Sequence, residues 1–498
     1  MMTRPVRRHR RYFPALAAAL SLLAPSIPLC SGASSLETIQ SKISQCLRRP
    51  GIRSAHWGME VIDTDGDQVL VSLNPDRAFT PASVLKVLTT SAALEKLGPD
   101  FRFRTGVYTS GRLLDDGTLA GDLYLVGRGD ANLTETPEDP SEKPAIQELA
   151  EKLGVLGIKR VAGNVIGDDS YFDPIGSGKD WTARELQSAY GSSICALNIN
   201  NNVVWISVWP GKTKGLVNVG MEPRTSYYRI RNLGVTGSRR ARRTISVRLI
   251  RKTRTIVVSG VLPLGQSINR YVRMDEPAEV AASILRDELQ RLGITVDGKV
   301  GVLHGGEMPP AEHRSLTLLV ERESPPLVHE LEIINKQSQN LHAEMLLRTL
   351  GAELAGEGTE EAGLQVVRSF IVEAGIEDQQ VSLGDGCGLS RENLVTPRFQ
   401  TSLLKYISTR PYFGPFLGTL AVSGTDGTLK NRMTAEPTKG VIFAKTGTLN
   451  GVSTLSGYMT TRSGRQLIFC IFANDARAST KRVRRTIDEI CSLFVNLY

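Results

Sequence analysis

Apolar positions along the 498-residue chain recur at two spacings, which separates helical segments from strand-forming ones. Apolar residues three and four positions apart predict helices over residues 34–47, 81–97, 328–350, 361–374 and 480–496. Short alternating or continuous apolar runs bounded by turn residues predict strands over residues 57–63, 68–73, 440–446, 453–459 and 466–472. Helices, then antiparallel strands, then a closing helix indicate an α+β domain.

The middle of the chain, about residues 102–318, has a different pattern. Many glycine turns separate short strands, which we expect at residues 123–126, 203–208, 244–250 and 255–258. We interpret this stretch as β-rich material inserted into the α+β domain. No internal repeat is visible in it or elsewhere.

The first 33 residues have the pattern of a signal peptide. Five arginines precede the first acidic residue, Glu37, and are followed by an apolar run at 15–24 that is too short to span a bilayer. A small-residue step ending at Ala33 offers a cleavage site, so we expect the mature chain to begin near Ser34. The peptide contains five arginines and no acidic residue, so its removal lowers the formal net charge from +9 to +4.

No later stretch reaches the roughly 18 to 20 apolar residues of a membrane span, so no transmembrane anchor is expected. We therefore expect an exported protein of the periplasm or cell envelope. With 41% hydrophobic and 22% charged residues, the chain lies in the globular range, and its length suggests about three domains.

Cysteine and histidine usage argues against several kinds of site. Cleavage leaves five cysteines, and their spacing is not that of a metal site. We expect these cysteines to be buried thiols. The alternative is one disulfide among Cys46, Cys470 and Cys491. The six histidines form neither HExxH nor a metal-spaced cluster. A phosphate-binding loop and a GxSxG elbow are also missing. We therefore expect neither a metal nor a cofactor.

Ser83 and Lys86 form an SxxK pair at the start of a strong helical pattern. Residues three apart lie on one helical face, so the amine is within reach of the hydroxyl that it would deprotonate. The helix N-terminus also offers N–H groups and positive potential to a developing oxyanion. SxxK alone occurs by chance in many chains of this length.

Two further motifs follow in the chain. Ser338-Gln339-Asn340 precedes an apolar helical pattern, and Lys445-Thr446-Gly447-Thr448 ends a predicted strand. A strand Lys-Thr-Gly offers a cation and a hydroxyl to a substrate carboxylate, and its glycine lets ligand backbone approach closely. SxxK, S-D-N and K-T-G in this order are the signature of penicillin-binding proteins and class A β-lactamases. Ser338-Gln339-Asn340 differs from S-D-N only at its middle residue and keeps both of the side chains that the motif uses.

The chain resembles that superfamily. The 255 residues between Ser83 and Ser338 are too many for a compact β-lactamase and resemble the low-molecular-mass class C penicillin-binding proteins of peptidase family S13, the D-alanyl-D-alanine carboxypeptidase/endopeptidase type. Matching runs at residues 121–127, 385–391 and 424–429 extend the resemblance over nearly all of the mature chain.

The resemblance implies a transpeptidase-like domain, an antiparallel sheet flanked by helices, that is built from residues 34–101 and 319–498. It further implies two nested inserted domains: one from residues 102–127 and 198–318, and inside it a second one from residues 128–197.

The resemblance also implies the chemistry. Ser83 attacks the peptide carbonyl between two D-alanines, Lys86 takes its proton, and the Ser83 and Thr448 N–H groups hold the oxyanion. The remaining catalytic residues are Ser338, Asn340 and Lys445; the substrate-binding residues are Thr446, Gly447 and Thr448. Water then hydrolyses the acyl-enzyme. The expected ligands are peptidoglycan peptides ending in D-Ala-D-Ala and β-lactams, which acylate Ser83.

Three more residues are expected to bind substrate by the same resemblance. Family members that cut diaminopimelate-containing peptides bind the diaminopimelate side chain with an Asp of the insert and with residues of an Asp-Gly-Ser-Gly-Leu-Ser-Arg run. Arg391 matches the Arg and Asp168 matches the Asp, although a polar turn is the alternative for Asp168. Cys387 replaces the Ser, and because a thiol hydrogen-bonds more weakly than a hydroxyl, recognition there is expected to be weaker or shifted.

Two other interpretations of the whole chain remain open at this point: a catalytically silent wall-binding scaffold and a β-lactamase. The presence of all five catalytic side chains favours an active peptidase. The arginine-rich run from Arg239 to Arg254 lacks the aromatic interleaving of a nucleic-acid site, so we expect no nucleic-acid partner. We interpret it as a solvated hairpin face rather than a peripheral contact with an anionic wall or membrane. His342 is expected to pack rather than act as a second base.

Overall fold

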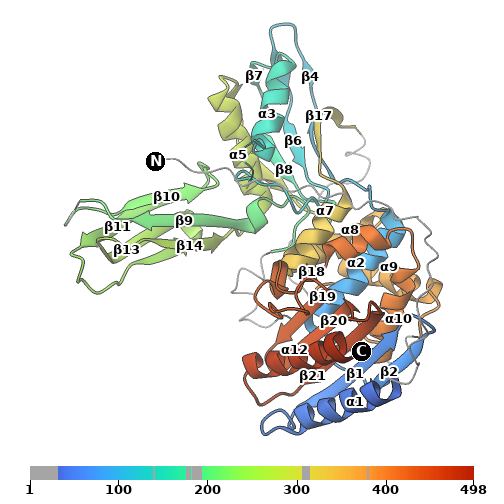
Figure 1. Ribbon diagram of the computed structural model, residues 1–498. Helices are drawn as coiled ribbons and strands as arrows, with labels where there is room; N and C mark the ends of the chain where they lie inside the picture. The colour runs from blue at the N-terminus through green and yellow to red at the C-terminus, as the bar shows by residue number, and fades with distance from the viewer. Residues whose placement is uncertain are drawn as a thin grey trace, which may run out of the picture.

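The computed structural model describes residues 32–137, 139, 141–174, 181, 193–212, 214–305, 315–377, 379 and 381–498, with side chains from residue 36 onward. Three parts are visible in Figure 1. We call them the main lobe (residues 32–101 and 324–498), the inserted lobe (102–202 and 274–323) and the arm (203–273). The main lobe lies at the lower right of the view, the inserted lobe above it, and the arm projects to the left.

The main lobe is built on a six-stranded sheet to which both ends of the chain contribute. Its strand order is β18-β19-β20-β21-β1-β2, and every neighbouring pair is antiparallel. The strands are β1 (His56–Asp63), β2 (Gln68–Leu73), β18 (Ala421–Val422), β19 (Ile442–Leu449), β20 (Val452–Thr460) and β21 (Gln466–Asn474). The long strands predicted from sequence match these within three residues at each end.

Two hydrophobic cores lie on opposite faces of this sheet. Along β21, Phe469 and Ile471 pack in one core, whereas Cys470 and Phe472 pack in the other, as the two-residue period of a strand requires. The first core is closed by α1 (Gly32–Arg48) and α12 (Thr480–Leu497). The second is closed by α2 (Lys86–Leu97), α7 (Leu327–Glu332), α8 (Asn340–Ala355), α9 (Glu360–Glu373), α10 (Pro397–Ser408) and α11 (Phe413–Thr419).

The inserted lobe contains a five-stranded and a four-stranded sheet, in the orders β16-β8-β6-β3-β17 and β15-β7-β5-β4. The first sheet comprises β3 (Arg104–Thr109), β6 (Leu123–Val126), β8 (Val165–Asp168), β16 (Val300–Leu303) and β17 (Thr317–Glu323). The second comprises β4 (Arg112–Leu113), β5 (Thr118–Ala120), β7 (Arg160–Val161) and β15 (Thr295–Val296). The lobe also contains α3 (Ala145–Val155) and α5 (Pro277–Arg291), which the β-rich interpretation of the insert missed.

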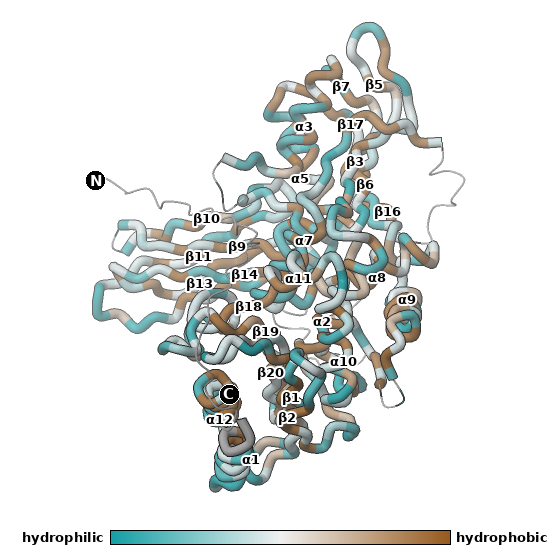
Figure 2. The backbone as a smooth tube through the Cα atoms, turned by 45° about the vertical axis from the view of Figure 1, so that its right-hand side comes forward, coloured by the Kyte–Doolittle hydropathy of each residue, from teal (hydrophilic) through white to brown (hydrophobic). Residues whose placement is uncertain are grey.

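The arm consists of two three-stranded sheets, β10-β9-β14 and β11-β13-β12. Its strands are β9 (Val203–Trp209), β10 (Asn218–Glu222), β11 (Arg229–Gly237), β12 (Ser246–Ile250), β13 (Thr255–Pro263) and β14 (Ile268–Arg273). Inward-facing Val204, Ile206 and Val208 alternate with exposed residues along β9. Figure 2 shows this change between hydrophobic and polar positions along the tubes of the arm.

The strand pairing divides the insert differently from the expectation. Residues 128–197 were expected to form the nested domain, but β8 lies between β6 and β16 in one sheet. The nested unit is instead the arm, residues 203–273. The local pattern gives no sign of this, because pairing between segments over a hundred residues apart depends on the tertiary fold.

Two smaller expectations concern cysteines and membrane spans. Cys46, Cys195, Cys387, Cys470 and Cys491 are all free and buried, in agreement with the buried-thiol interpretation. None of the helices in the described part of the chain is both long and apolar enough to cross a membrane.

Candidate active site

Ser83 and Lys86 lie where a short 3-10 turn, η1 (Ala82–Leu85), passes into α2. The sequence predicts one helix over 81–97; its first turn is tighter than an α-helix. Ala82 has a φ of 49°, a conformation that costs a non-glycine residue about 1 kcal/mol or more. In this turn Ser83 is half-buried, whereas the Lys86 side chain is fully buried.

The Lys86 amine has three neighbours. Its Nζ donates hydrogen bonds to Asn340 Oδ1 (2.7 Å) and to the Cys387 carbonyl (2.6 Å), and it lies 3.2 Å from Ser83 Oγ. A neutral amine has two hydrogens, and the two acceptors occupy both. Its lone pair is then left for the Ser83 hydroxyl.

Burial lowers the pKa of Lys86, because the charged form loses its hydration. Nearby Cys387, Asp385 and Glu344 act in the opposite direction. The pKa of Lys445 falls well below its ordinary value, first through burial and then through the positive charge of Lys86. Two buried amines near each other therefore favour a state in which at least one is neutral, as a general base requires.

Ser338 and Asn340 lie at a break between helices. The sequence predicts one continuous helix over 328–350, but α7 runs into a π-helical turn, Ile333–Gln337, and Ser338 takes a left-handed conformation (φ 62°) before α8 begins at Asn340. Buried Asn335 secures the π-helical turn by donating to Thr90 Oγ1 (3.3 Å) and Thr419 Oγ1 (3.0 Å). The break lets Asn340 face Lys86 and Ser338 face β19.

Lys445 reaches Ser338 from strand β19. Its Nζ donates to Ser338 Oγ at 2.9 Å and to the Thr446 carbonyl at 3.0 Å. The strand lies against η1 because residue 447 is a glycine: a Cβ there would fall 2.6 Å from the Pro81 carbonyl and 2.1 Å from Thr454 Oγ1. The structure thus brings the three motifs predicted from sequence into one group.

The hydroxyls of β19 have partners that the sequence did not indicate. Thr446 Oγ1 donates to Thr428 Oγ1 at 2.9 Å, and Arg484 Nη2 of α12 donates to Thr448 Oγ1 at 2.7 Å. Arg484 belongs to a basic helix with no distinguishing motif, so only the fold shows that it reaches Thr448. It adds a cation next to the predicted carboxylate-binding threonines.

The 385–391 run forms a tight buried loop around Asp385. The Gly388 and Ser390 N–H groups both donate to this carboxylate at 2.6 Å, and Asn393 Nδ2 donates at 2.8 Å. The Cys387 thiol is fully buried, 3.7 Å from Asp385 Oδ2. Direct contact of this thiol with substrate, as predicted, does not fit its burial; the group of Cys387 that faces the site is its carbonyl, on Lys86.

Glu344 supports this loop from α8 and was not among the predicted residues. Its Oε1 accepts from the Gly386 N–H (2.8 Å) and its Oε2 from Arg348 Nη1 (3.2 Å). Burial and the nearby Asp385 carboxylate raise its pKa to about 7. Within the described residues, Glu344, Asp385 and Cys387 are also a group of potential metal ligands, but these protein donors already occupy the oxygens.

Arg391 and Asp168 are placed differently. Arg391 Nη2 donates to the Asn450 carbonyl (2.9 Å) in the turn after β19, so it lies beside the KTG strand. Asp168 is buried at the end of β8 and accepts from the N–H and Oγ of Ser170 (3.0 and 2.6 Å) within its own turn. Within the described residues, Asp168 is not part of the hydrogen-bond network around Ser83.

His342, one helical turn beyond Ser338, is held on both ring nitrogens. Nδ1 lies 2.9 Å from Glu330 Oε1 and Nε2 lies 2.6 Å from Asn201 Oδ1. With both nitrogens engaged and the ring buried, His342 fits the packing interpretation rather than that of a second base.

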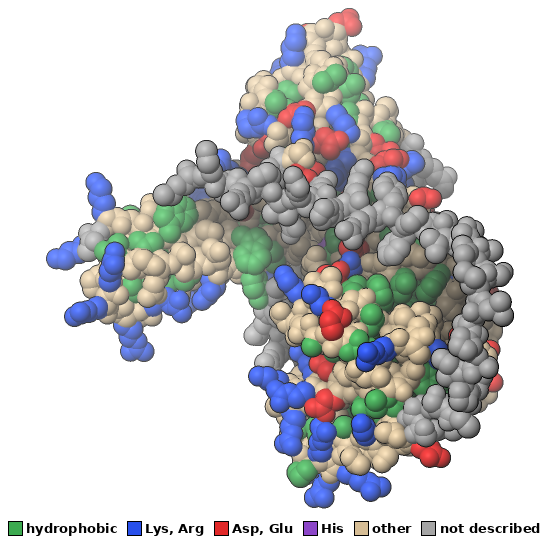
Figure 3. Space-filling view, viewed as in Figure 1, with side chains coloured by type: hydrophobic (Ala, Val, Ile, Leu, Met, Phe, Trp, Pro, Cys, Tyr) green, Lys and Arg blue, Asp and Glu red, His purple; other side chains and the backbone are tan. Residues whose placement is uncertain are grey.

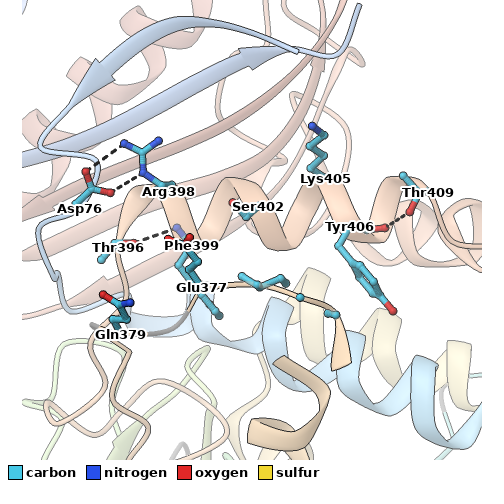
Figure 4. A pocket seen from close by; sticks show the side chains of 13 residues that line it. Asp76, Glu377, Gln379, Thr396, Arg398, Phe399, Ser402, Lys405, Tyr406 and Thr409 are labelled. Carbon is cyan, nitrogen blue, oxygen red and sulfur yellow. Dashed lines mark hydrogen bonds and ion pairs between the residues drawn. The ribbon is translucent and has the colours of Figure 1, made fainter. Parts of the chain in front are cut away.

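A surface pocket of about 690 Å³ lies elsewhere in the main lobe, beside α10 (Figure 4). Three of its four charged side chains are already paired: Arg398 Nε donates to Asp76 at 2.5 Å, and Lys405 contacts Asp67 at 2.8 Å. None of the three motifs lines it. The three sequence motifs therefore lie outside this pocket.

A serine beside a buried lysine, together with SxN and KTG on a helix-flanked antiparallel sheet, is the arrangement of the penicillin-binding and β-lactamase-like serine enzymes. The profile of the D-Ala-D-Ala carboxypeptidase 3 (S13) family matches residues 39–493. The chain belongs to this family, and it is a serine-type D-Ala-D-Ala carboxypeptidase. The predicted resemblance and the α+β fold class are both confirmed.

Similar proteins carry related names. The chain is 34% identical over 473 residues to the D-alanyl-D-alanine carboxypeptidase of Actinomadura sp. (strain R39), which covers 93% of this chain and 85% of that protein. It is 28% identical to the D-alanyl-D-alanine carboxypeptidase DacB of Haemophilus influenzae, over 84% of this chain and 86% of that one. The crystal structure of penicillin binding protein 4 (dacB) from H. influenzae matches with a TM-score of 0.75 and 27% identity, covering 91% of this chain and 98% of that one.

Proposed function

We propose that Ser83 is the nucleophile of a carboxypeptidase/endopeptidase that acts on peptidoglycan peptides ending in D-Ala-D-Ala. The observation that carries this proposal is the environment of Lys86. Both hydrogens of its neutral amine have acceptors, and the remaining face lies 3.2 Å from Ser83 Oγ. The other buried amine of the site, Lys445, lies against Ser338 Oγ at 2.9 Å, on a residue that comes from the second motif.

In the acylation step, Lys86 removes the Ser83 proton while Oγ attacks the carbonyl of the penultimate D-alanine. The developing oxyanion lies at the N-terminal turn of η1, where the Ser83 N–H and the Thr448 N–H of β19 are its proposed donors. Lys445 donates to Ser338, so the Ser338 hydroxyl can give its hydrogen to the leaving amine and take one from Lys445 in its place. The proton that Lys86 took from Ser83 replaces the one given by Lys445, and Lys86 is neutral again at the end of the step. The terminal D-alanine departs as the C–N bond breaks.

The terminal carboxylate of the substrate is proposed to bind along β19. Thr446 and Thr448 offer hydroxyls, Gly447 leaves room for ligand backbone, and Arg484 adds positive charge at Thr448. Arg391 lies at the end of the same strand and is the proposed contact for a more distant acidic group of the peptide. Asp168 remains a prediction from the resemblance alone.

In deacylation, neutral Lys86 accepts a proton from water while the water oxygen attacks the acyl carbonyl; the bond from the carbonyl carbon to Ser83 Oγ then breaks, and Lys86 returns the proton to Oγ. An amine acceptor in place of water would give transpeptidation. A cross-linked peptide in place of the terminal D-alanine would make the same step an endopeptidase reaction. β-Lactams carry an amide and a carboxylate in a similar relation, so we expect them to acylate Ser83.

The test is the intact mass of the purified protein, followed over time with benzylpenicillin, with release of D-alanine from a D-Ala-D-Ala peptide measured in parallel. Ser83→Ala should form no adduct and release no D-alanine. Ser91→Ala is the matched control: it removes a buried hydroxyl two turns along the same helix, where Oγ bonds only to the Val87 carbonyl. It should keep both activities.

The alternatives predict different results. Fast loss of penicillin without a lasting adduct would identify a β-lactamase. A folded protein that forms no adduct and releases no D-alanine would be the silent wall-binding scaffold, and the proposal would be wrong.

Export to the cell envelope is a second part of the proposal. It is supported by the arginine-rich and apolar start of the sequence with a small-residue step at Ala33. N-terminal sequencing of protein from the envelope fraction should begin near Ser34. A mature protein that still begins at Met1 would contradict it.

A further inference from the structure

The arm is far more basic than the rest of the molecule. Residues 203–273 contain 15 lysines and arginines and a single acidic residue, Glu222, in a chain whose total formal charge is only +9. The remainder of the chain is therefore net acidic. In Figure 3, Lys and Arg side chains project from the far end and the lower edge of the arm, and no acidic side chain is visible on this face of it.

The two ends of the arm differ in whether their basic residues form ion pairs. At the root, Arg251 pairs with Asp275 (3.2 Å) and Arg254 pairs with Glu279 (2.8 Å), and Arg254 also lies 4.1 Å from the centre of the Tyr227 ring. These charges hold the arm to the inserted lobe. Both arginines are exposed, as expected for a solvated face, although they also form ion pairs.

At the tip, the basic residues lack such partners. The loop between β11 and β12 contains four exposed arginines: Arg239, Arg240, Arg242 and Arg243. No ion pair joins any of the four to a described residue. The loop between β9 and β10 lies alongside, because the Lys214 N–H donates to the Thr236 carbonyl (2.9 Å) and the Thr236 N–H to the Gly215 carbonyl (2.8 Å). Exposed Lys212 and Lys214 thereby join the same cationic tip.

Large apolar side chains are exposed at this tip as well. Trp209 is 44% exposed at the end of β9, Leu216 is 59% exposed in the adjoining loop, and Val235 of β11, bridged to Leu216, is 38% exposed. Buried positions in the arm are filled by other residues, so these three are available for contact. Six unpaired cations surrounding exposed Trp and Leu are the composition of an interfacial membrane anchor.

We propose that the tip of the arm docks on an anionic lipid bilayer, with Lys and Arg at the phosphate headgroups and with Trp209 and Leu216 inserted among them. Charge complementarity selects an anionic partner. The exposed apolar side chains favour a bilayer over a soluble anionic polymer, because such a polymer would satisfy the cations and leave Trp209 and Leu216 in water. This proposal is independent of the chemistry assigned to Ser83.

The experiment is co-sedimentation of the whole protein with vesicles, either of phosphatidylcholine alone or containing 30% phosphatidylglycerol, at low and high salt. We expect binding to the anionic vesicles only, weakened by salt. Changing Arg239, Arg240, Arg242 and Arg243 together to Gln should lower the apparent affinity at least tenfold. A matched control changes four exposed, unpaired basic residues of the main lobe to Gln: Lys42, Arg48, Arg53 and Arg462. It should bind as the unchanged protein does.

A second variant, Trp209→Ser with Leu216→Ser, separates a bilayer from a polymer. We expect it to lose affinity for anionic vesicles severalfold while its retention by soluble polyphosphate is unchanged. If the apolar variant binds vesicles normally, or if the control variant loses as much affinity as the arginine variant, the membrane proposal is wrong. A urea-unfolding curve that matches that of the unchanged protein shows that each variant is folded, without relying on the Ser83 site.

Discussion

At the scale of single residues, the site depends on carboxylates that never touch the reacting atoms. Glu344 and Asp385 lie buried behind Lys86 and stabilise its positive charge, while burial acts against that charge. The balance between the two decides at which pH Lys86 becomes a base. Burial and the Asp385 carboxylate raise the pKa of Glu344 to about 7.

Glu344→Gln should change both stability and catalysis in a pH-dependent way. A carboxyl whose folded pKa of about 7 exceeds its ordinary 4.5 favours the folded state most below pH 4.5, and this contribution is lost as the pH rises through 7. The full shift corresponds to about 3 kcal/mol. The amide of the variant cannot ionise. The free energy of unfolding in urea should therefore rise for the variant relative to the unchanged protein, by up to that amount, as the pH goes from 5 to 8.

The same change removes a negative charge near Lys86, which lowers the pKa of Lys86 further. The acidic limb of the penicillin acylation profile should therefore move to lower pH. Glu357→Gln, at an exposed position after α8, is the control and should alter neither curve. The prediction is wrong if the variant loses the same stability at every pH and the acidic limb of its acylation profile does not move. Glu344 would then have a packing role only.

Arg484 provides a second test at this scale. Its hydrogen bond to Thr448 places a cation beside the proposed carboxylate site, and a charge-assisted hydrogen bond contributes about 1.5 to 3 kcal/mol. Arg484→Ala should raise KM for a peptide with a free C-terminal carboxylate by about tenfold, with kcat less affected. Arg485→Ala, an exposed neighbour on α12, should leave KM unchanged. An equal loss with a C-terminally amidated peptide would show that Arg484 does not recognise the carboxylate.

At the scale of elements, the site depends on close contact between β19 and η1. Gly447→Ala would put a Cβ 2.6 Å from the Pro81 carbonyl and 2.1 Å from Thr454 Oγ1, so the strand and the Ser83 turn must move apart. We expect penicillin acylation to slow at least a hundredfold, measured by intact mass over time. Gly418→Ala in α11 meets nothing within 4 Å and should acylate normally, with a stability gain of about 0.5 to 1 kcal/mol.

Sequence periodicity predicts the elements around the site better than the joints between them. The strands that became β19, β20 and β21 and the helices that became α1, α9 and α12 follow directly from apolar spacing. The break at residues 333–339 does not, because Ile333, Ile334 and Leu341 continue a helical apolar pattern across it. The π-helical turn and the left-handed Ser338 depend on Asn335 bonding to Thr90 and Thr419, which are distant in sequence.

At the scale of the whole molecule, motifs were easier to predict than the division into domains. SxxK, SxN and KTG have fixed local spacings, so their order alone indicated that they share a site. The extent of the nested unit depends on which strands pair, and β8 pairs with β6 and β16 rather than within its own segment. Arg484 and Glu344 were missed for the same reason: each is an ordinary helical residue until the fold places it.

The main lobe and the inserted lobe meet at His342. This buried ring on α8 connects Glu330 of the main lobe with Asn201 of the inserted lobe, and Glu330 in turn contacts Asn132 of the inserted lobe. His342→Ala leaves Glu330 and Asn201 without this partner, which should cost about 2 to 4 kcal/mol in urea unfolding. His329→Ala, at an exposed histidine on α7, should cost almost nothing.

Because both nitrogens of His342 are engaged away from Ser83, the penicillin acylation rate of folded His342→Ala should stay within about threefold of normal. A hundredfold slower acylation at unchanged stability would instead make His342 the second base of the reaction.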